Sequence, residues 1–381
     1  MNKYLQRQAT KIIDSYFADP AYHGRILIIY GPRQIGKTTL VKKVLETQQN
    51  GQYFNCDLLQ NQELFSYQNA HNLSQTIGQL DLIVLDEAQR IENIGIVLKI
   101  LIDQYPDKRI IATGSSSFAL SNRINEPLTG RKVIMRLYPF SYGELTQGRS
   151  FPDQQSQIEF ALRFGSYPEV TLNGEQKAQQ FLTEITSSYL YRDIFTFQDL
   201  RKPTVLTRLL QLLAFQIGSE VSYHEIGKQI GLDKKSVQRY IHLLEEAFVV
   251  FQLNALSRNP RKEISKKPKI YFYDLGVRNA IIQAFQPIHL RQDLGALWEN
   301  YCLLERLKWH NYNQSFVNQY FWRSYSQKEI DYVEEKNGQL FAFEFKWSKK
   351  SKASMPKQFA ESYPEAQFEV INPSNIANFL K

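Results

Sequence analysis

Gly31-Pro-Arg-Gln-Ile-Gly-Lys-Thr38 follows directly on the apolar run Ile26-Leu-Ile-Ile-Tyr30. A buried strand, a glycine loop and then a helix form the context that a phosphate-binding loop requires. The backbone N–H groups of such a loop surround the phosphates of a nucleotide, the lysine reaches the outer phosphates, and the last hydroxyl coordinates Mg²⁺. Glycine is needed at positions 31 and 36, because a side chain would block the tight turn and the approach to phosphate. The residues expected to bind the nucleotide are Gly31, Pro32, Arg33, Gln34, Ile35, Gly36, Lys37, Thr38 and Thr39.

Composition limits the class of protein. The chain has 381 residues, enough for two or three domains, and its hydrophobic content of 43% supports real cores. Two cysteines, Cys56 and Cys302, give no disulfide framework and indicate buried thiols in a reducing compartment. The six histidines show no metal-ligand spacing, the start of the chain lacks the apolar region of a secretory signal, and no apolar run is long enough to span a bilayer. We therefore expect a cytoplasmic protein with no membrane contact.

The net charge of +8 is carried entirely by the second half of the chain. Residues 1–200 hold 20 basic and 20 acidic residues, whereas residues 201–381 hold 26 basic and 18 acidic residues. This asymmetry favours a polyanionic partner of the second half, with nucleic acid as the leading candidate. A basic surface that only confers solubility is the alternative.

A second apolar run, Leu82-Ile-Val-Leu85, ends in Asp86-Glu87. This pattern is typical of a buried parallel strand that presents carboxylates at its C-terminal end. There Asp86 can hold Mg²⁺ through water, and Glu87 can polarise the water that attacks the γ-phosphate.

Two further loops offer candidate catalytic residues. The run Arg109 to Ser117 predicts a strand that opens into a small polar loop, where Thr113 or Ser115 can contact the γ-phosphate or the attacking water; ordinary loop capping is the alternative. Arg131 ends the segment Leu-Thr-Gly-Arg before another predicted strand. An arginine in such a loop can act on the γ-phosphate of a neighbouring subunit, and a solvated arginine is the competing interpretation.

These motifs together resemble a bacterial and archaeal group of AAA+ ATPases, whose cores are similar to origin-recognition and STAND-type ATPases and whose C-terminal domain has long been of unknown function. The resemblance covers nearly the whole chain and implies ATP and Mg²⁺ as cofactors, with roles for Lys37, Thr38, Asp86 and Glu87. It extends to Thr113, Arg131 and a lid arginine, Arg192. It also implies self-association, with a hexameric ring as one form. The segments that carry it, besides the loop and the two strand ends, are Leu128–Arg131, Leu137–Glu144, Gly165–Glu169 and Tyr189–Asp193.

Residues from about 150 to 200 predict helices. Apolar and aromatic residues recur at helical spacing from Gln155 to Phe164 and from Gln176 to Phe195. A helical lid of this kind packs over a nucleotide and converts its phosphate state into movement.

The segment from Ser222 to Leu244 predicts a short helix, a turn at Gly231-Leu232 and a second helix capped by Asp233. A strand is expected at Ala247–Leu253, so a winged helix is the predicted form. On the second helix Lys234, Lys235, Gln238 and Arg239 fall where a recognition helix meets phosphates and bases. Winged helices also serve as packing units between proteins or domains, which is the alternative. The basic stretch from Ser257 to Lys269 that follows is read as a phosphate-tracking loop or a solvated linker.

The last part of the chain predicts a helix containing Glu299 and then a hairpin that turns at Lys336-Asn-Gly338. Alternation places Glu344 and Lys346 on one face of the second hairpin strand, beside Asp331 on the first. This arrangement resembles the PD-(D/E)xK nuclease core. The resemblance implies that Asp331 and Glu344 bind Mg²⁺ with help from Glu299, and that Lys346 positions or activates the attacking water. A solvent-facing hairpin is the alternative.

The predicted fold class is an α/β P-loop (AAA+) domain with a helical lid, then a winged helix, then an α/β restriction-endonuclease-like domain. The expected ranges are 1–149 for the ATPase core, 150–200 for the lid, 201–256 for the winged helix and 257–381 for the nuclease-like domain. The predicted function is ATP hydrolysis that positions or remodels DNA, with metal-dependent cleavage as an added activity. The alternative is a nucleotide-controlled switch that binds DNA or a protein partner and does not cut.

Overall fold

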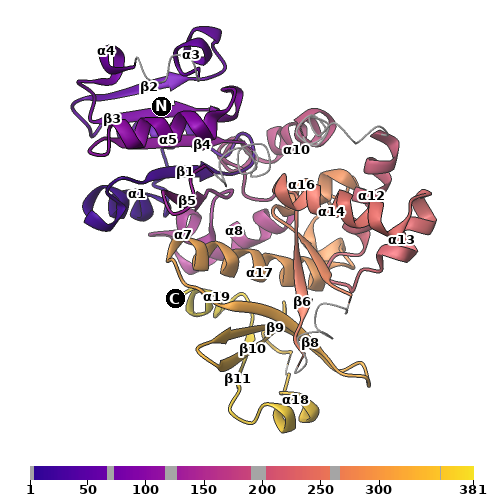
Figure 1. Ribbon diagram of the computed structural model, residues 1–381. Coiled ribbons are helices and arrows are strands. Elements are labelled where there is room, and N and C mark those ends of the chain that lie inside the picture. Colours follow the sequence, from indigo (N-terminus) through magenta and orange to yellow (C-terminus); the bar gives the residue numbers. More distant parts are fainter. Residues whose placement is uncertain (1–3, 67–72, 116–126, 190–202, 258–266, 352) are drawn as a thin grey trace. The chain divides into compact units, whose positions relative to one another are not determined.

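The computed structural model describes residues 4–66, 73–115, 127–189, 203–257, 267–351 and 353–381. The chain divides into two compact units, Met1–Pro139 and Phe140–Lys381. Figure 1 labels the elements of both. No helix in the described ranges is both long enough and apolar enough to cross a membrane. Both cysteines, Cys56 and Cys302, are buried and unpaired, as expected from their small number.

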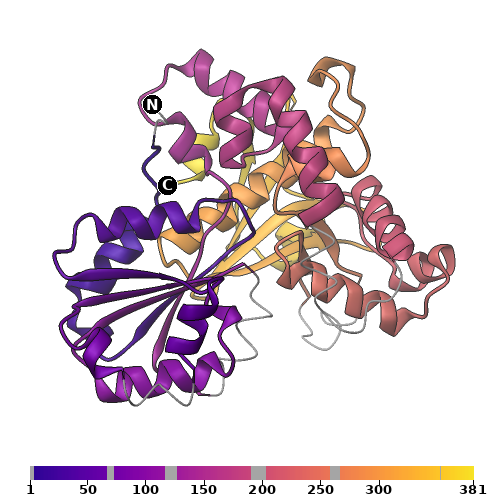
Figure 2. The ribbon, with the colours of Figure 1, turned by 90° about the horizontal axis from the view of Figure 1, so that it is seen from above.

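A five-stranded parallel sheet forms the core of the first unit, with the strand order β2-β3-β4-β1-β5. Every residue of β1 and β3 is buried, because helices lie on both faces of this sheet (Figure 2). The predicted buried strands are therefore confirmed. The strands are β1 (Ile26–Tyr30), β2 (Gly51–Asn55), β3 (Leu82–Asp86), β4 (Arg109–Gly114) and β5 (Lys132–Arg136). The helices are α1 (Thr10–Ala18), η1 (Pro20–Tyr22), α2 (Lys37–Leu45), α3 (Leu59–Leu64), α4 (Ser74–Ile77), η3 (Ala88–Arg90) and α5 (Ile94–Gln104).

The position of β4 decides where the polar strand ends meet. β4 pairs with β1 on one side and with β3 on the other, and all three run parallel. Their C-terminal ends therefore lie at one edge of the sheet, which is where polar side chains gather in open α/β sheets. The glycine loop after β1, the carboxylates after β3 and the hydroxyls at the end of β4 are neighbours for this reason.

The second unit begins with helices and continues into a six-stranded mixed sheet of order β11-β10-β9-β8-β6-β7. Its helical elements are α7 (Tyr142–Thr146), α8 (Phe151–Phe164), α9 (Pro168–Asn173), α10 (Glu175–Glu184), a π-helical segment η4 (Ile185–Tyr189), α12 (Pro203–Phe215), α13 (Tyr223–Ile230), α14 (Lys234–Glu246), α16 (Leu275–Ile281), η5 (Ile288–Leu290), α17 (Leu294–Tyr312), α18 (Lys357–Ser362) and α19 (Ile376–Phe379). Its strands are β6 (Val250–Ala255), β7 (Lys269–Phe272), β8 (Asn318–Arg323), β9 (Glu329–Lys336), β10 (Gln339–Phe345) and β11 (Gln367–Ile371).

Helix α17 organises the second unit. Its Asn300 side chain both accepts from the backbone N–H of Phe272 (2.7 Å) and donates to the carbonyl of the same residue (2.9 Å), which ties the helix to β7. The indole N–H of Trp298, which is fully buried, donates to the carbonyl of Ile371 in β11 at 3.3 Å. The helix thus fixes both edges of the six-stranded sheet.

Two segments that carry the family resemblance, Leu137–Glu144 and Gly165–Glu169, make buried contacts in this unit, and the first of them contacts α17. The carboxylate of Glu305 on α17 accepts the backbone N–H of Tyr142 at 2.6 Å. Lys308, also buried, donates to the carbonyl of Phe140 at 2.9 Å and to Glu305 at 2.7 Å. This pairing satisfies two charges that would be costly to bury alone. The start of the second unit is therefore anchored on α17.

Gly165 allows the backbone of its own segment to approach the carboxylate of Asp274, the residue that precedes α16. A Cβ at this position would lie 2.0 Å from Oδ1 of Asp274, so a larger residue would collide with that carboxylate. Asp274 accepts the backbone N–H of Ser166 at 2.8 Å and caps α16 through the N–H of Val277 at 3.0 Å. Burial raises the pKa of Asp274 to about 6, against the opposing effect of these hydrogen bonds.

The predicted helix–turn–helix is confirmed as α13 and α14. Ser222 caps α13, Gly231 ends it with φ of 72°, and Asp233 caps α14 through the backbone N–H of Ser236. The expected strand is present as β6, but β6 pairs with β8 and so joins the large sheet. The sheet therefore runs across residue 256, where the sequence suggested a domain boundary. The assignment of 150–200, 201–256 and 257–381 to separate domains stays a prediction.

The helix expected over Gln176–Phe195 is present as far as the structure describes that range, because α10 ends at Glu184 and passes into the π-helical segment η4, which ends at Tyr189. Residues beyond 189 in that range, including Arg192, lie outside the described residues. One expectation from the sequence needs correction. The basic stretch from Ser257 to Lys269 is expected to be a loop or a linker, but its last residue, Lys269, begins β7 and is 1% exposed. Residues 258–266 of the same stretch also lie outside the described residues.

Candidate functional site

The glycine loop joins β1 to α2 at the polar edge of the first sheet. Gly36 has φ of 89° and forms the N-cap of α2, a conformation that disfavours any residue with a Cβ. A Cβ on Gly31 would lie 2.2 Å from the backbone carbonyl oxygen of Leu137. Both glycines are thus required by geometry, as the sequence predicts. In the same loop Pro32 and Ile35 are buried, Gln34 and Thr39 are exposed, and Arg33 is half-buried.

The ammonium group of Lys37 lies inside the loop. Its Nζ donates to the carbonyl oxygens of Gly31 (2.9 Å) and Pro32 (2.7 Å), and the side chain is buried. A cation held by loop carbonyls is in place to exchange these weak partners for phosphate oxygens, which form stronger charge-assisted bonds.

Asp86, at the end of β3, gathers hydroxyl groups from three neighbouring elements. Its Oδ2 accepts hydrogen bonds from Oγ1 of Thr38 and from the phenol of Tyr53, each at 2.6 Å. Its Oδ1 accepts from Oγ1 of Thr113, which is fully buried on β4. The structure thus brings the predicted residues Thr38, Asp86 and Thr113 into one hydrogen-bonded set.

Glu87 follows in a left-handed backbone conformation with φ of 55°. Its backbone N–H donates to Oγ1 of Thr113 at 3.2 Å, so one threonine connects both carboxylate residues. The side-chain amide of Gln89 donates to Glu87 Oε2 and to Oγ of Ser115, the latter at 3.3 Å. The Glu87 carboxylate is therefore held by Gln89 in this structure.

Three contributors to this site were missed from the sequence. Tyr53 on β2 reaches Asp86, and burial together with that carboxylate raises the pKa of Tyr53, so its phenol stays protonated as a donor. Gln89 holds Glu87. Arg7 donates to the carbonyls of Ile35 (2.8 Å) and Tyr138 (2.5 Å), and these hydrogen bonds connect the glycine loop to the chain after β5. Tyr53 and Arg7 act over long sequence separations, which no local pattern marks. Gln89 lies only two residues from Glu87, but a lone glutamine after the carboxylates is not a distinctive signal.

Arg131 lies away from this set. It directly precedes β5, whose register pairs Lys132 with Ile26 at the start of the parallel strand β1. The glycine loop follows the other end of β1, so Arg131 is at the opposite edge of the sheet. Its guanidinium pairs with Asp103 at the end of α5. A role for Arg131 within its own nucleotide site is thus not supported, and the expected action on a neighbouring subunit stays a prediction.

The predicted DNA-facing residues share one exposed surface of α14. Lys234, Lys235, Gln238 and Arg239 are all exposed, whereas Val237 on the same helix is buried. Asp233 caps the helix, and the hydrogen bonds with Ser236 lower the pKa of its carboxyl. This surface therefore combines two lysines and an arginine within the first two turns of a helix.

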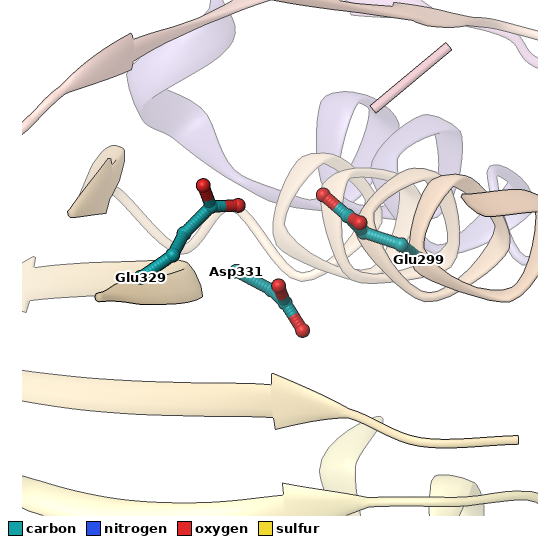
Figure 3. Close-up of side chains that lie close together, drawn as sticks. All are labelled: Glu299, Glu329 and Asp331. Atoms are coloured by element: carbon teal, nitrogen blue, oxygen red, sulfur yellow. The ribbon is translucent and has the colours of Figure 1, made fainter. Parts of the chain in front are cut away.

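The C-terminal sheet contains a cluster of carboxylates. Glu299 extends from α17 toward Glu329 and Asp331 of β9, and one oxygen from each lies within 4.8 Å of the others (Figure 3). Glu344 instead pairs with Lys346, whose Nζ lies 2.6 Å from Glu344 Oε1. Of the predicted set, the structure thus groups Glu299 with Asp331, and it adds Glu329, which the sequence reasoning did not single out.

A buried lysine enters the same cluster. Nζ of Lys269 donates to Oε1 of Glu299 at 2.9 Å and to Oε1 of Glu329, and the phenol of Tyr271 donates to Glu299 at 2.5 Å. Burial raises the pKa of Glu299 to about 7, an effect that Lys269 opposes. Burial and the nearby Glu344 raise the pKa of Asp331 to about 6.

These carboxylates do not fit a divalent ion as they stand. A divalent ion binds carboxylate oxygens at about 2.0–2.6 Å, which leaves no room for an ammonium on the same oxygens. Here Glu299 and Glu329 bind an ammonium, Asp331 accepts the backbone N–H of Phe345 at 2.8 Å, and Glu344 binds its own lysine. The cluster as it stands therefore does not support a metal-dependent reaction.

Comparison with known families divides the chain in three. Residues 23–146 match the family model of an AAA domain. The parallel α/β sheet of the N-terminal unit matches a P-loop ATPase fold. Residues 155–287 and 294–377 match two domains of unknown function, DUF8612 and DUF4143.

Similar proteins have been found in bacteria and archaea. An uncharacterized protein of Mycobacterium tuberculosis is 26% identical over 324 residues, which cover 84% of this chain and 70% of the relative. An uncharacterized protein of Methanocaldococcus jannaschii is 25% identical over 271 residues, or 66% of this chain and 60% of that protein. A Walker-type ATPase of Pyrococcus abyssi superposes with a TM-score of 0.48 at 15% identity, covering 73% of this chain and 96% of the other.

Proposed function

We propose that the chain is an ATP-hydrolysing protein of the AAA+ type that acts on DNA. The observation that carries the ATPase part is the convergence of Thr38 and Thr113 on the Asp86 carboxylate beside the glycine loop. The match of residues 23–146 to an AAA domain supports the same activity. Each of these residues has a distinct role in the reaction that we propose.

Thr38 and Asp86 fit a magnesium ion. Their side-chain oxygens lie 2.6 Å apart at the mouth of the loop, and hydroxyl and carboxylate oxygens are the ligands that this ion prefers. When bound with ATP, the ion neutralises charge that develops on the phosphates. Asp86 remains oriented by Tyr53 and Thr113, which keep their hydroxyls on the carboxylate.

Lys37 and Glu87 supply the remaining chemistry. Lys37 exchanges the carbonyls of Gly31 and Pro32 for the outer phosphates of ATP. Glu87 orients the attacking water and accepts its proton as the bond to phosphorus forms. Because the Gln89 amide holds the Glu87 carboxylate, Glu87 must leave this hydrogen bond before it can act. Arg131 is proposed to act across a subunit contact in a self-associated form.

Hydrolysis is tested by replacing the lysine of the loop. We expect Lys37→Ala to abolish ATP turnover, whereas Lys43→Ala, an exposed lysine on the same helix paired with Glu46, should keep it. If Lys37→Ala hydrolyses ATP as fast as the wild type, the central proposal fails. Sedimentation with and without a non-hydrolysable nucleotide tests self-association.

The DNA part rests on the exposed basic surface of α14 and on the charge excess of the second half of the chain. Lys234 and Lys235 would contact phosphates, and Gln238 and Arg239 would reach base edges or further phosphates. Duplex binding should weaken as salt rises, because each phosphate contact releases a counterion. The double variant Lys234→Ala/Lys235→Ala should weaken binding and reduce this salt slope. Lys228→Ala, an exposed lysine at the end of α13, serves as the matched control.

Cleavage of DNA by the C-terminal domain is a second candidate function. The element order α17, β8, β9, β10, α18, β11 gives one helix, three antiparallel strands, a second helix and a parallel strand. This order favours the nuclease-like fold, with Asp331 on β9 beside Glu344 on β10. Incubation of wild type and Asp331→Ala with Mg²⁺ or Mn²⁺ and duplex, forked or single-stranded DNA tests it. Equal survival of DNA with both proteins removes cleavage and leaves a nucleotide-controlled switch for DNA or a protein partner.

A further inference from the structure

Lys269 is the first residue of β7 and enters the carboxylate cluster from the strand at the edge of the sheet. Its side chain is 2% exposed. Its ammonium contacts the carboxylates of Glu299 on α17 and Glu329 on β9, which lie 30 and 60 residues further along the chain. A buried charge is tolerated only where it is paired and hydrogen-bonded. The position of this lysine is therefore set by the cluster.

The ammonium occupies the place that a cation bridging Glu299 and Glu329 would need. Both contacts use Oε1 of these glutamates, and Figure 3 shows Glu299 extending from its helix toward the strand that bears Glu329 and Asp331. A divalent ion binds carboxylate oxygens at about 2.0–2.6 Å, closer than an ammonium does. Such an ion could not share these oxygens with Lys269 and would have to displace it.

Displacement would be costly, because Lys269 would lose two carboxylate partners that other side chains also contact. The phenol of Tyr271 holds Glu299, and the guanidinium of Arg323 lies 3.6 Å from Glu329 on its other oxygen. A displaced ammonium would have to leave a site with almost no contact with water and would lose its partners. Removing one partner from a buried pair costs several times more than an exposed pair contributes.

We propose that Lys269 is the built-in cation of the Glu299–Glu329–Asp331 cluster, so that the C-terminal domain holds this site together without a divalent ion. In this domain the side chains that resemble a metal-dependent nuclease serve to join β7, α17 and β9. The cluster then does not supply the metal site of a nuclease. This inference opposes the second candidate function, metal-dependent cleavage, and it stands whether or not the first unit hydrolyses ATP.

Binding of Mn²⁺ to the full chain without nucleotide tests the inference, with free Mn²⁺ measured by electron paramagnetic resonance. Wild type and Asp331→Asn should bind the same amount of Mn²⁺, because the cluster takes up none in either. More ions on the wild type than on Asp331→Asn would overturn the inference. This comparison needs no change to Lys269, and any site near Asp86 is identical in both proteins.

A second variant tests the role of the lysine itself. Lys269→Met keeps an apolar stem and removes the ammonium, so it should gain about one Mn²⁺ per chain over the wild type. Lys269→Met/Glu299→Gln should lose that gain, and Lys267→Met, an exposed neighbour, should behave as the wild type. A folded Lys269→Met that binds no more Mn²⁺ than the wild type would refute the blocking role. If Lys269→Met does not fold, the comparison of wild type with Asp331→Asn still decides.

Discussion

Replacing Thr113 by valine removes one hydroxyl from the nucleotide site and almost nothing else. Valine has nearly the same shape as threonine, and Thr113 is fully buried in β4, so the packing is kept. The hydroxyl has two partners, Oδ1 of Asp86 and the backbone N–H of Glu87. Thr113→Val therefore affects both carboxylate residues of the site at once.

The expected magnitude follows from these two bonds. A hydrogen bond to a charged group contributes about 1.5–3 kcal/mol, and a buried N–H left without an acceptor costs about 1–3 kcal/mol. Asp86 keeps its bonds from Thr38 and Tyr53, so only part of this loss reaches the reaction. If about half of this free energy is added to the activation barrier of hydrolysis, kcat falls about 10- to 100-fold. The KM for ATP should change much less, because Lys37 and the loop backbone are untouched.

Steady-state ATP hydrolysis measures both constants, and circular dichroism checks that the variant is folded. Thr113→Ser is the matched control, since it keeps the hydroxyl and loses only a methyl group. We expect its kcat to stay within about threefold of the wild type. A folded Thr113→Val with a wild-type kcat would show that Thr113 does not position Asp86 and Glu87.

Three further outcomes are expected. Gly31→Ala places a Cβ 2.2 Å from a backbone carbonyl oxygen, so binding of a fluorescent ATP analogue should be lost, whereas Gly295→Ala, with open space around it, should bind normally. Tyr53→Phe removes one hydroxyl from Asp86, and the Mg²⁺ concentration for half-maximal hydrolysis should rise about tenfold; an unchanged value contradicts the orienting role of the phenol. Burial raises the pKa of Asp274 from 3.8 to about 6, so the folded state binds a proton that the unfolded state releases between these values. The protonated carboxyl group therefore contributes its full share to the free energy of unfolding below about pH 4, and about 3 kcal/mol of this share is lost as the pH rises through 6. The free energy of unfolding measured in urea should fall more steeply with pH in the wild type than in Asp274→Asn.

Much of the arrangement of the proposed nucleotide site could be predicted, because many of its determinants are local. Gly36 is required by the backbone conformation of the loop itself, and the carboxylates at the end of β3 follow a run of apolar residues. The motif also predicts Gly31, although the atom that a Cβ there would meet belongs to the distant residue Leu137. Since parallel strands end at one edge of a sheet, the proximity of these carboxylates to the loop could be expected as well. The helix–turn–helix was predictable for the same reason, because its caps and apolar spacing lie within one short segment.

The remaining residues could not be found in this way. Tyr53 reaches Asp86 only because β2 is the neighbour of β3, and the sequence does not state the strand order. Lys269 lies in a run of basic residues that read as solvent-exposed, yet its partners Glu299 and Glu329 are far along the chain. The parallel pairing of β6 with β8, which joins the helix–turn–helix to the C-terminal sheet, is likewise a long-range contact.

The covalent connection between the two units is short. In the first unit the backbone N–H of Leu137 donates to the carbonyl of Tyr30, the last residue of β1, at 2.7 Å. In the second unit Lys308 on α17 donates to the carbonyl of Phe140 at 2.9 Å. Tyr138 and Pro139 are the two residues between these hydrogen-bonded residues, and the ring of Pro139 fixes its φ angle. A few flexible residues inserted after Pro139 would therefore lengthen the connection and leave the hydrogen bonds at both of its ends intact.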